Sequence, residues 1–145
     1  MHRRPLGRGR TLAVVGAALA VVGCILPWWQ VGGTPGITSQ SGTGLEGSSI
    51  LVFLVGIVTL ALVVLPYATG DRPVGFDRTL SFALLGGVGW IGFGWRVVEL
   101  VMMGAFQFSA PAQVFTNGPG LWLSLAGLAI MARAAYVMTR ESSYR

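Results

Sequence analysis

The sequence has no lysine, a single cysteine and a single histidine, and only 10% of its 145 residues are charged. One cysteine excludes an intrachain disulfide and a cluster of thiolate ligands. Because His2 lies in a basic tail, we expect no metal and no haem or other cofactor. Soluble domains carry about 25% charged residues. This scarcity of charge, with 53% hydrophobic residues, indicates a membrane protein and not a water-soluble one.

Four apolar stretches are each close to the ~20 residues that an α-helix needs to cross a hydrocarbon core of ~30 Å. Because the bilayer core offers the backbone no water, each stretch is predicted to be a helix. The predicted spans are 11–29, 48–67, 80–103 and 121–138. The expected fold is all-α: an antiparallel four-helix transmembrane bundle that forms one integral membrane domain over residues 1–145.

Arginine placement predicts the orientation of this bundle. Eight of the ten arginines lie before the first span, in the loop 68–79, or at the C-terminal end of the chain, whereas the loops 30–47 and 105–120 contain none. Since cytoplasmic segments are enriched in basic residues, both termini and the loop 68–79 are predicted to be cytoplasmic, and the other two loops lie outside. The net charge of +5 follows the ends of the spans, so the lipid bilayer is the expected partner and nucleic acid is not. The predicted location is the cell (plasma) membrane, as a multi-pass protein of a bacterial inner membrane.

The N-terminal segment leaves one alternative open. The residues "VVGC" (21–24) form a loose lipobox, and a lipoprotein would be cleaved before Cys24 and carry lipid on it. The following residues, "ILPWWQ", are still apolar, and the run is longer than the ~7–15 residues of a signal-peptide core. An uncleaved first helix is therefore the favoured interpretation.

Aromatic and small residues locate the predicted surfaces of the helices. Rings near the ends of spans are expected to anchor the helices at the membrane interfaces. The predicted anchors are Trp28, Trp29, Trp122, Tyr67 and Tyr136. Helices in lipid associate through close van der Waals contact, so small residues mark contact faces. The predicted contact residues are Gly16, Ala20, Gly89 and Gly92.

The third span contains two charged residues, Arg96 and Glu99, three positions apart. At alternating spacings of four and three they share a helix face with Gly89 and Gly92, so the pair is expected inside the bundle. An adjoining face is expected to meet lipid, and it comprises Trp90, Phe93, Val97 and Leu100. In the fourth span, Arg133 either extends toward the cytoplasmic surface or reaches into the bundle toward Glu99.

Two short motifs resemble those of a known group of proteins. They are "ILPWWQV" at the end of the first span and "GPGLWLSLAGLAI" at the start of the last. Both resemble small four-helix bacterial membrane proteins of unknown function, in which Leu-Pro-Trp closes the first span. The resemblance implies the four-helix fold and an integral-membrane location.

Two functional hypotheses follow. The favoured one is a non-enzymatic accessory, scaffold or assembly subunit, whose partners are other membrane protein subunits or further copies of the chain, and in which Arg96 and Glu99 form a structural ion pair. The alternative is a small carrier, or a ligand- or lipid-binding bundle, that uses Arg96, Glu99 and Arg133. No catalytic residue is predicted, because the spans contain neither a pair of carboxylates nor the histidine of a nucleophilic triad.

Overall fold

The computed structural model describes residues 7–32, 35–36, 38–68, 78–105 and 117–143. Its four long helices are α1 (Arg8–Ile25), α2 (Ile50–Ala68), α3 (Arg78–Met102) and α5 (Pro119–Ser143). Four stretches of 18 to 23 residues, one for each helix, are long and apolar enough to cross a membrane, and the stretch for α2 begins three residues before that helix, at Gly47. The prediction of a mostly helical protein with four helices long and apolar enough to span a membrane is therefore confirmed.

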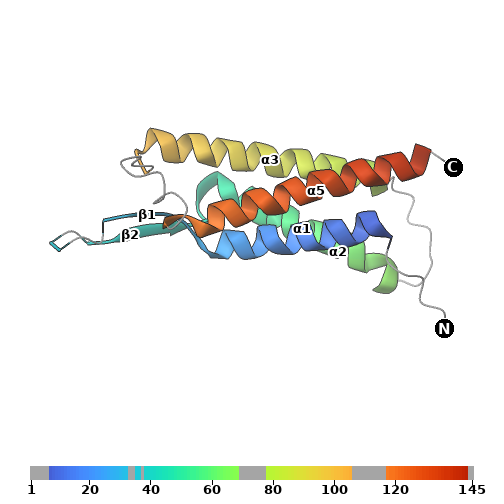
Figure 1. Ribbon diagram of the computed structural model, residues 1–145, viewed down its shortest axis with the longest axis horizontal. Coiled ribbons are helices and arrows are strands. Elements are labelled where there is room, and N and C mark those ends of the chain that lie inside the picture. The colour runs from blue at the N-terminus through green and yellow to red at the C-terminus, as the bar shows by residue number, and fades with distance from the viewer. Residues whose placement is uncertain (1–6, 33–34, 37, 69–77, 106–116, 144–145) are drawn as a thin grey trace.

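Consecutive helices run in opposite directions and form a four-helix bundle in which each helix packs against two neighbours (Figure 1). α1 packs against α2 and α5, and α3 packs against the same two helices. One end of the bundle, called here the hairpin end, holds the end of α1, the start of α2, the end of α3 and the start of α5, and a small β-hairpin projects beyond it. The start of α1 and the end of α5 lie at the opposite end.

The β-hairpin is a feature that the sequence patterns did not predict. Strands β1 (Pro27–Val31) and β2 (Gln40–Thr43) pair in antiparallel fashion. Leu26 is already extended, with φ −77° and ψ 158°, because a residue before proline avoids helical geometry. The predicted first span, 11–29, is therefore too long at its C-terminal end. The predicted loop 30–47 contains part of this hairpin, and the short 3-10 helix η1 (Gly47–Ser49) precedes α2.

Small residues bring α1 and α5 into close contact. A Cβ atom on Gly16 would lie only 2.7 Å from the carbonyl oxygen of Gly127 and 2.8 Å from the backbone nitrogen of Met131. Both helices present residues at alternating spacings of four and three, which is the period of a coiled-coil seam. This α1–α5 seam comprises Gly9, Ala13, Gly16, Ala20 and Gly23 from α1, and Gly120, Ser124, Gly127, Met131 and Ala134 from α5. The predicted contact residues Gly16 and Ala20 thus lie where two backbones meet.

Glycines also set the position of α3. A Cβ atom on Gly89 would lie 2.8 Å from Leu128 Cδ2 of α5, and one on Gly92 would lie 2.7 Å from Leu51 Cβ of α2. The face of α3 that carries Gly89 and Gly92 therefore packs against both neighbouring helices. The same face, continued toward the hairpin end, brings Arg96 against Gly47, which begins η1 directly before α2.

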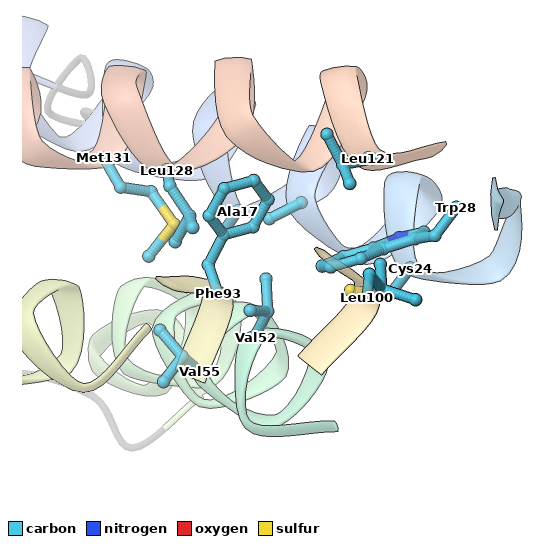
Figure 2. Packing of buried hydrophobic residues seen from close by; sticks show 11 residues of the cluster. Ala17, Cys24, Trp28, Val52, Val55, Phe93, Leu100, Leu121, Leu128 and Met131 are labelled. Carbon is cyan, nitrogen blue, oxygen red and sulfur yellow. The ribbon is translucent and has the colours of Figure 1, made fainter. Parts of the chain in front are cut away.

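The adjoining face of α3 is largely covered by the bundle, so the prediction that it meets lipid is wrong for Phe93 and Leu100. Phe93 and Leu100 are only 6% and 0% exposed, Val97 is half-buried, and Trp90 alone of the four is exposed. Figure 2 shows Phe93 pointing from α3 into the centre of the buried cluster. Because both α2 and α5 pack against α3, they cover more of its surface than a single neighbouring helix would. The buried stripe of α3 therefore includes the face of Gly89 and Gly92 and also part of the adjoining face.

Candidate functional site

Arg96 lies near the hairpin end of α3, where its guanidinium group stands between two carboxylates. Its Nη1 donates a hydrogen bond of 2.8 Å to Oε2 of Glu99, which is three residues further along the same helix. Its Nη2 lies 3.9 Å from Oε2 of Glu46, which immediately precedes η1. Residues three apart are neighbours on a helix surface, so the first contact is local, whereas the second joins α3 to the hairpin segment.

Glu46 is itself held by the turn that connects β2 to η1. Its Oε1 accepts a hydrogen bond from the backbone N–H of Thr43, at 3.4 Å, and its own N–H donates to the Thr43 carbonyl, also at 3.4 Å. The Ser49 hydroxyl donates to the Glu46 carbonyl oxygen at 2.5 Å. One carboxylate thus braces the turn through one oxygen and meets Arg96 through the other.

Gly47 covers the ion pair with its backbone. Its φ of +62° is in the left-handed region, which glycine adopts without steric cost. A Cβ atom at this position would lie 2.7 Å from Nη1 of Arg96 and 3.2 Å from Oε2 of Glu99. Both the backbone conformation and the close approach therefore call for glycine. Arg96, Glu99, Glu46 and Gly47 are called here the Arg96 cluster.

Burial and charge differ across the Arg96 cluster. The side chain of Arg96 is 7% exposed, that of Glu99 29% and that of Glu46 55%. Two carboxylates and one guanidinium give the cluster a net charge of −1, so the cation is buried and the excess negative charge is the part that water reaches. This arrangement neutralises Arg96 and disfavours the binding of a further anion.

Two buried polar atoms near the hairpin end, Nε of Arg96 and Nε1 of Trp29, have no hydrogen-bond partner among the residues that the structure describes. A Cβ atom on Gly42 would touch both Nε1 of Trp29 and Oε2 of Glu46, so the indole nitrogen lies beside the Arg96 cluster. Both atoms can donate a hydrogen bond. They give the cluster capacity for a small polar molecule such as water, in addition to the ion pairs.

Arg133 is not brought to this cluster. It is exposed on α5, and no ion pair joins it to any other residue that the structure describes. Leu128 of α5 meets α3 at Gly89. From that level Arg133 lies five residues further from the hairpin end and Arg96 seven residues nearer to it, a separation of about 18 Å along the bundle at ~1.5 Å per residue. The predicted ligand set of Arg96, Glu99 and Arg133 is therefore not assembled.

Trp28 is a core residue, which corrects its prediction as an interfacial anchor. It is fully buried, its Nε1 donates a hydrogen bond of 3.0 Å to the Gly23 carbonyl near the end of α1, and its ring centroid lies 5.4 Å from that of Phe93. In Figure 2 the indole lies beside Cys24 and Leu100. The register of β1 on β2 is irregular between Pro27 and Trp29, and Trp28 at this irregularity is fully buried, while Trp29 is half-buried against the same cluster.

The other predicted anchors lie in varied positions. Trp29 and Trp122 are half-buried at the hairpin end, and Tyr136 is exposed toward the opposite end, where the Arg140 guanidinium lies 4.9 Å from its ring centroid. The side chain of Tyr67 lies outside the described residues.

Cys24 is also buried, with Sγ 3.8 Å from the Ser124 hydroxyl. A lipid attached to Cys24 would have to open this contact between α1 and α5. Among the residues that the structure describes, no group of three His, Cys, Asp or Glu side chains could hold a metal ion.

Glu46 is a member of the Arg96 cluster to which the sequence patterns assign no role, because its surroundings in the loop 30–47 are rich in glycine, serine and threonine. The available signal was that Glu46 is the only charged residue between the first and second predicted spans, opposite a buried arginine that needs a counter-ion.

Comparisons of the chain with protein-family models, with curated proteins and with solved structures find no match.

Proposed function

We propose that the chain is a non-enzymatic, multi-pass protein of the cell membrane that acts as an accessory, scaffold or assembly subunit. The observation that carries the proposal is the position of Arg96, which is buried at the hairpin end and shared between Glu99 of α3 and Glu46 beside η1. Both carboxylates engage the same cation, so the role of the cluster is to fix the hairpin on the bundle.

The charge balance favours this structural role over a carrier of anions. A buried arginine is costly unless it is paired, and pairing it with two carboxylates removes the attraction for an anionic ligand. A carrier site built on Arg96 and Arg133 would need the two cations near each other, and about 18 Å separates them along the bundle. The geometry therefore supports a rigid attachment of the hairpin more than a transport path.

The arginine distribution supports an orientation in which the hairpin lies on the outer side of the membrane. Basic residues gather at the end of the bundle opposite to the hairpin, and basic segments are retained on the cytoplasmic side. In the proposed orientation both termini are cytoplasmic, and β1 and β2 form a small platform on the outer surface. An accessory subunit could present such a platform to a larger complex.

The orientation is tested by labelling single cysteines in intact cells, in a Cys24→Ser background. Ser41 on β2 and Thr139 on α5 are both exposed and lie near opposite ends of the chain's bundle. A membrane-impermeant thiol reagent should label Ser41→Cys in intact cells and Thr139→Cys only after permeabilisation. The reverse pattern would overturn the proposed orientation.

The accessory role is tested by mild solubilisation of native membranes, followed by affinity purification and mass spectrometry. A photo-crosslinking residue at Gln40, which is exposed on β2, should capture a defined membrane protein or a second copy of the chain. Capture should fall when Arg96→Gln removes the cation that Glu46 meets on α3. A wild-type chain that purifies as a monomer, with no captured protein, would refute the proposal.

A further inference from the structure

Arg133 is a charged residue that the Arg96 cluster leaves unused. It lies inside the apolar stretch Pro119–Arg140 of α5, and its side chain is exposed. Seven residues, or about 10 Å, separate it from Arg140 at the end of that stretch. The two carboxylates whose side chains are described, Glu46 and Glu99, both lie at the hairpin end and belong to Arg96.

The direction of the side chain limits how Arg133 can reach water. Side chains of a helix tilt toward its N-terminus, and the N-terminus of α5 is at the hairpin end. Arg133 therefore leans toward the middle of the membrane and away from the nearer surface. A charge in this position is best satisfied by a counter-ion that lies within the membrane.

The surroundings of Arg133 admit another helix at close range. At alternating spacings of three and four, the same exposed face of α5 carries Ala126, Ala129, Arg133, Tyr136 and Arg140. Alanines on this face allow the backbone of a neighbouring helix to approach closely, as helix contacts in lipid require. The exposed side of α2 differs, because it carries the bulky residues Leu54, Ile57 and Val64.

We propose that a transmembrane helix of a partner protein docks on this face of α5 and carries an aspartate or glutamate that pairs with Arg133. A second copy of the chain in the same orientation does not fit, because its only carboxylate within a predicted span is Glu99, which lies at the hairpin end and pairs with its own Arg96. The inference rests on the proposed role as an accessory subunit and adds the chemistry of the contact. The competing occupant is the phosphate group of an anionic lipid.

The test places a photo-crosslinking residue at Ala129, one helical turn from Arg133, in the full-length chain in native membranes. The matched control places it at Ala18, an exposed small residue of α1. Ala129 should capture a membrane polypeptide that has an acidic residue in a span, whereas Ala18 should capture lipid. Arg133→Gln should lower the capture at least tenfold, and Arg133→Lys should retain most of it. Because Arg133 is exposed, both variants should keep the elution profile of the wild-type protein.

Charge exchange then identifies the pair itself. Arg133→Asp should abolish capture at Ala129, and changing the acidic residue of the captured helix to arginine should restore it. Arg140→Gln, at the end of the stretch, should leave capture unchanged. Capture of phospholipid alone at Ala129, or protein capture that Arg133→Gln does not alter, would overturn the inference. In the second case a partner is still present, so the proposed function survives, whereas a wild-type chain with no partner at all would remove both.

Discussion

The α1–α5 seam gives the sharpest test of the packing, because it contains glycines at which a larger residue would clash with the backbone of the other helix. A Cβ atom added at Gly16 would lie 2.7 Å from the Gly127 carbonyl oxygen and 2.8 Å from the Met131 backbone nitrogen, whereas ordinary contacts begin at 3.4 Å. Backbone atoms cannot rotate away as the end of a long side chain can. Gly16→Ala therefore forces α1 and α5 apart by roughly half an ångström or more, and a gap of this size forfeits about a quarter to a half of the dispersion energy of each atom pair.

The matched control is Gly87→Ala on α3, where an added Cβ atom would meet nothing within 4 Å. Alanine is favoured over glycine in a helix by about 0.8–1.0 kcal/mol, and this gain applies to both substitutions. Overpacking a close contact costs about 1–3 kcal/mol. Gly87→Ala is therefore expected to raise the free energy of unfolding by about 0.5–1 kcal/mol, while Gly16→Ala, in which the cost of overpacking exceeds the helix gain, lowers it by up to about 2 kcal/mol.

The measurement is the free energy of unfolding of each purified variant in one detergent, from a denaturant titration followed by tryptophan fluorescence. The opposite signs make the comparison decisive, because a general effect of alanine on helix stability would move both variants in the same direction. If Gly16→Ala were as stable as Gly87→Ala, α1 and α5 would not meet through their backbones at this point, and the order of the helices in the bundle would have to be revised.

Three further predictions test the hairpin end by the same titration. Glu99→Gln is expected to destabilise the fold more than Glu46→Gln, because the buried guanidinium is 2.8 Å from the first carboxylate and 3.9 Å from the more exposed second one; equal effects would count against a single shared cation. Gly47→Ala should lower the free energy of unfolding more than Gly104→Ala does. Both glycines have a positive φ, at which an alanine costs about 1–2 kcal/mol. Only the alanine at position 47 would also place its Cβ atom against the Arg96 cluster. Trp28→Phe should lower the free energy of unfolding by about 1–3 kcal/mol, because it removes the indole hydrogen bond to the Gly23 carbonyl near the end of α1. An unchanged free energy would mean that another donor satisfies this carbonyl.

The four helices could be predicted from the sequence because length and apolar composition are local properties of each segment. The burial of Arg96 also followed from a local pattern, since Gly89 and Gly92 continue its stripe along α3. The lipid-facing side of α3 was predicted wrongly because periodicity shows that a helix has an apolar stripe but not how many neighbours cover it. Phe93 and Leu100 are buried because both α2 and α5 pack against α3.

The hairpin end could not be predicted in the same way, because its contacts join distant parts of the chain. β1 and β2 are five and four residues long, and the second consists of polar and small residues that give no apolar alternation. Trp28 turns inward only because α1 ends at Ile25 and a strand begins. The contact between Glu46 and Arg96 depends on the register of that hairpin and on the position of α3, and neither is encoded in a short window of sequence.

The two arginines within the apolar helices differ in their ion pairs with the residues that the structure describes: Arg96 has such partners and Arg133 has none. Arg96 is buried, and the chain supplies both of its counter-ions, one of them from a segment outside the helices. Arg133 is exposed within an equally apolar helix, and about 18 Å along the bundle separates it from Arg96 and the two carboxylates that pair with Arg96. Since a charge in a span is costly unless it is paired or lies next to water, the first arginine stabilises the fold as it stands, and the second is the residue for which we propose a contact with a partner. This asymmetry is the reason to seek the partner on the exposed face of α5 as well as at the hairpin.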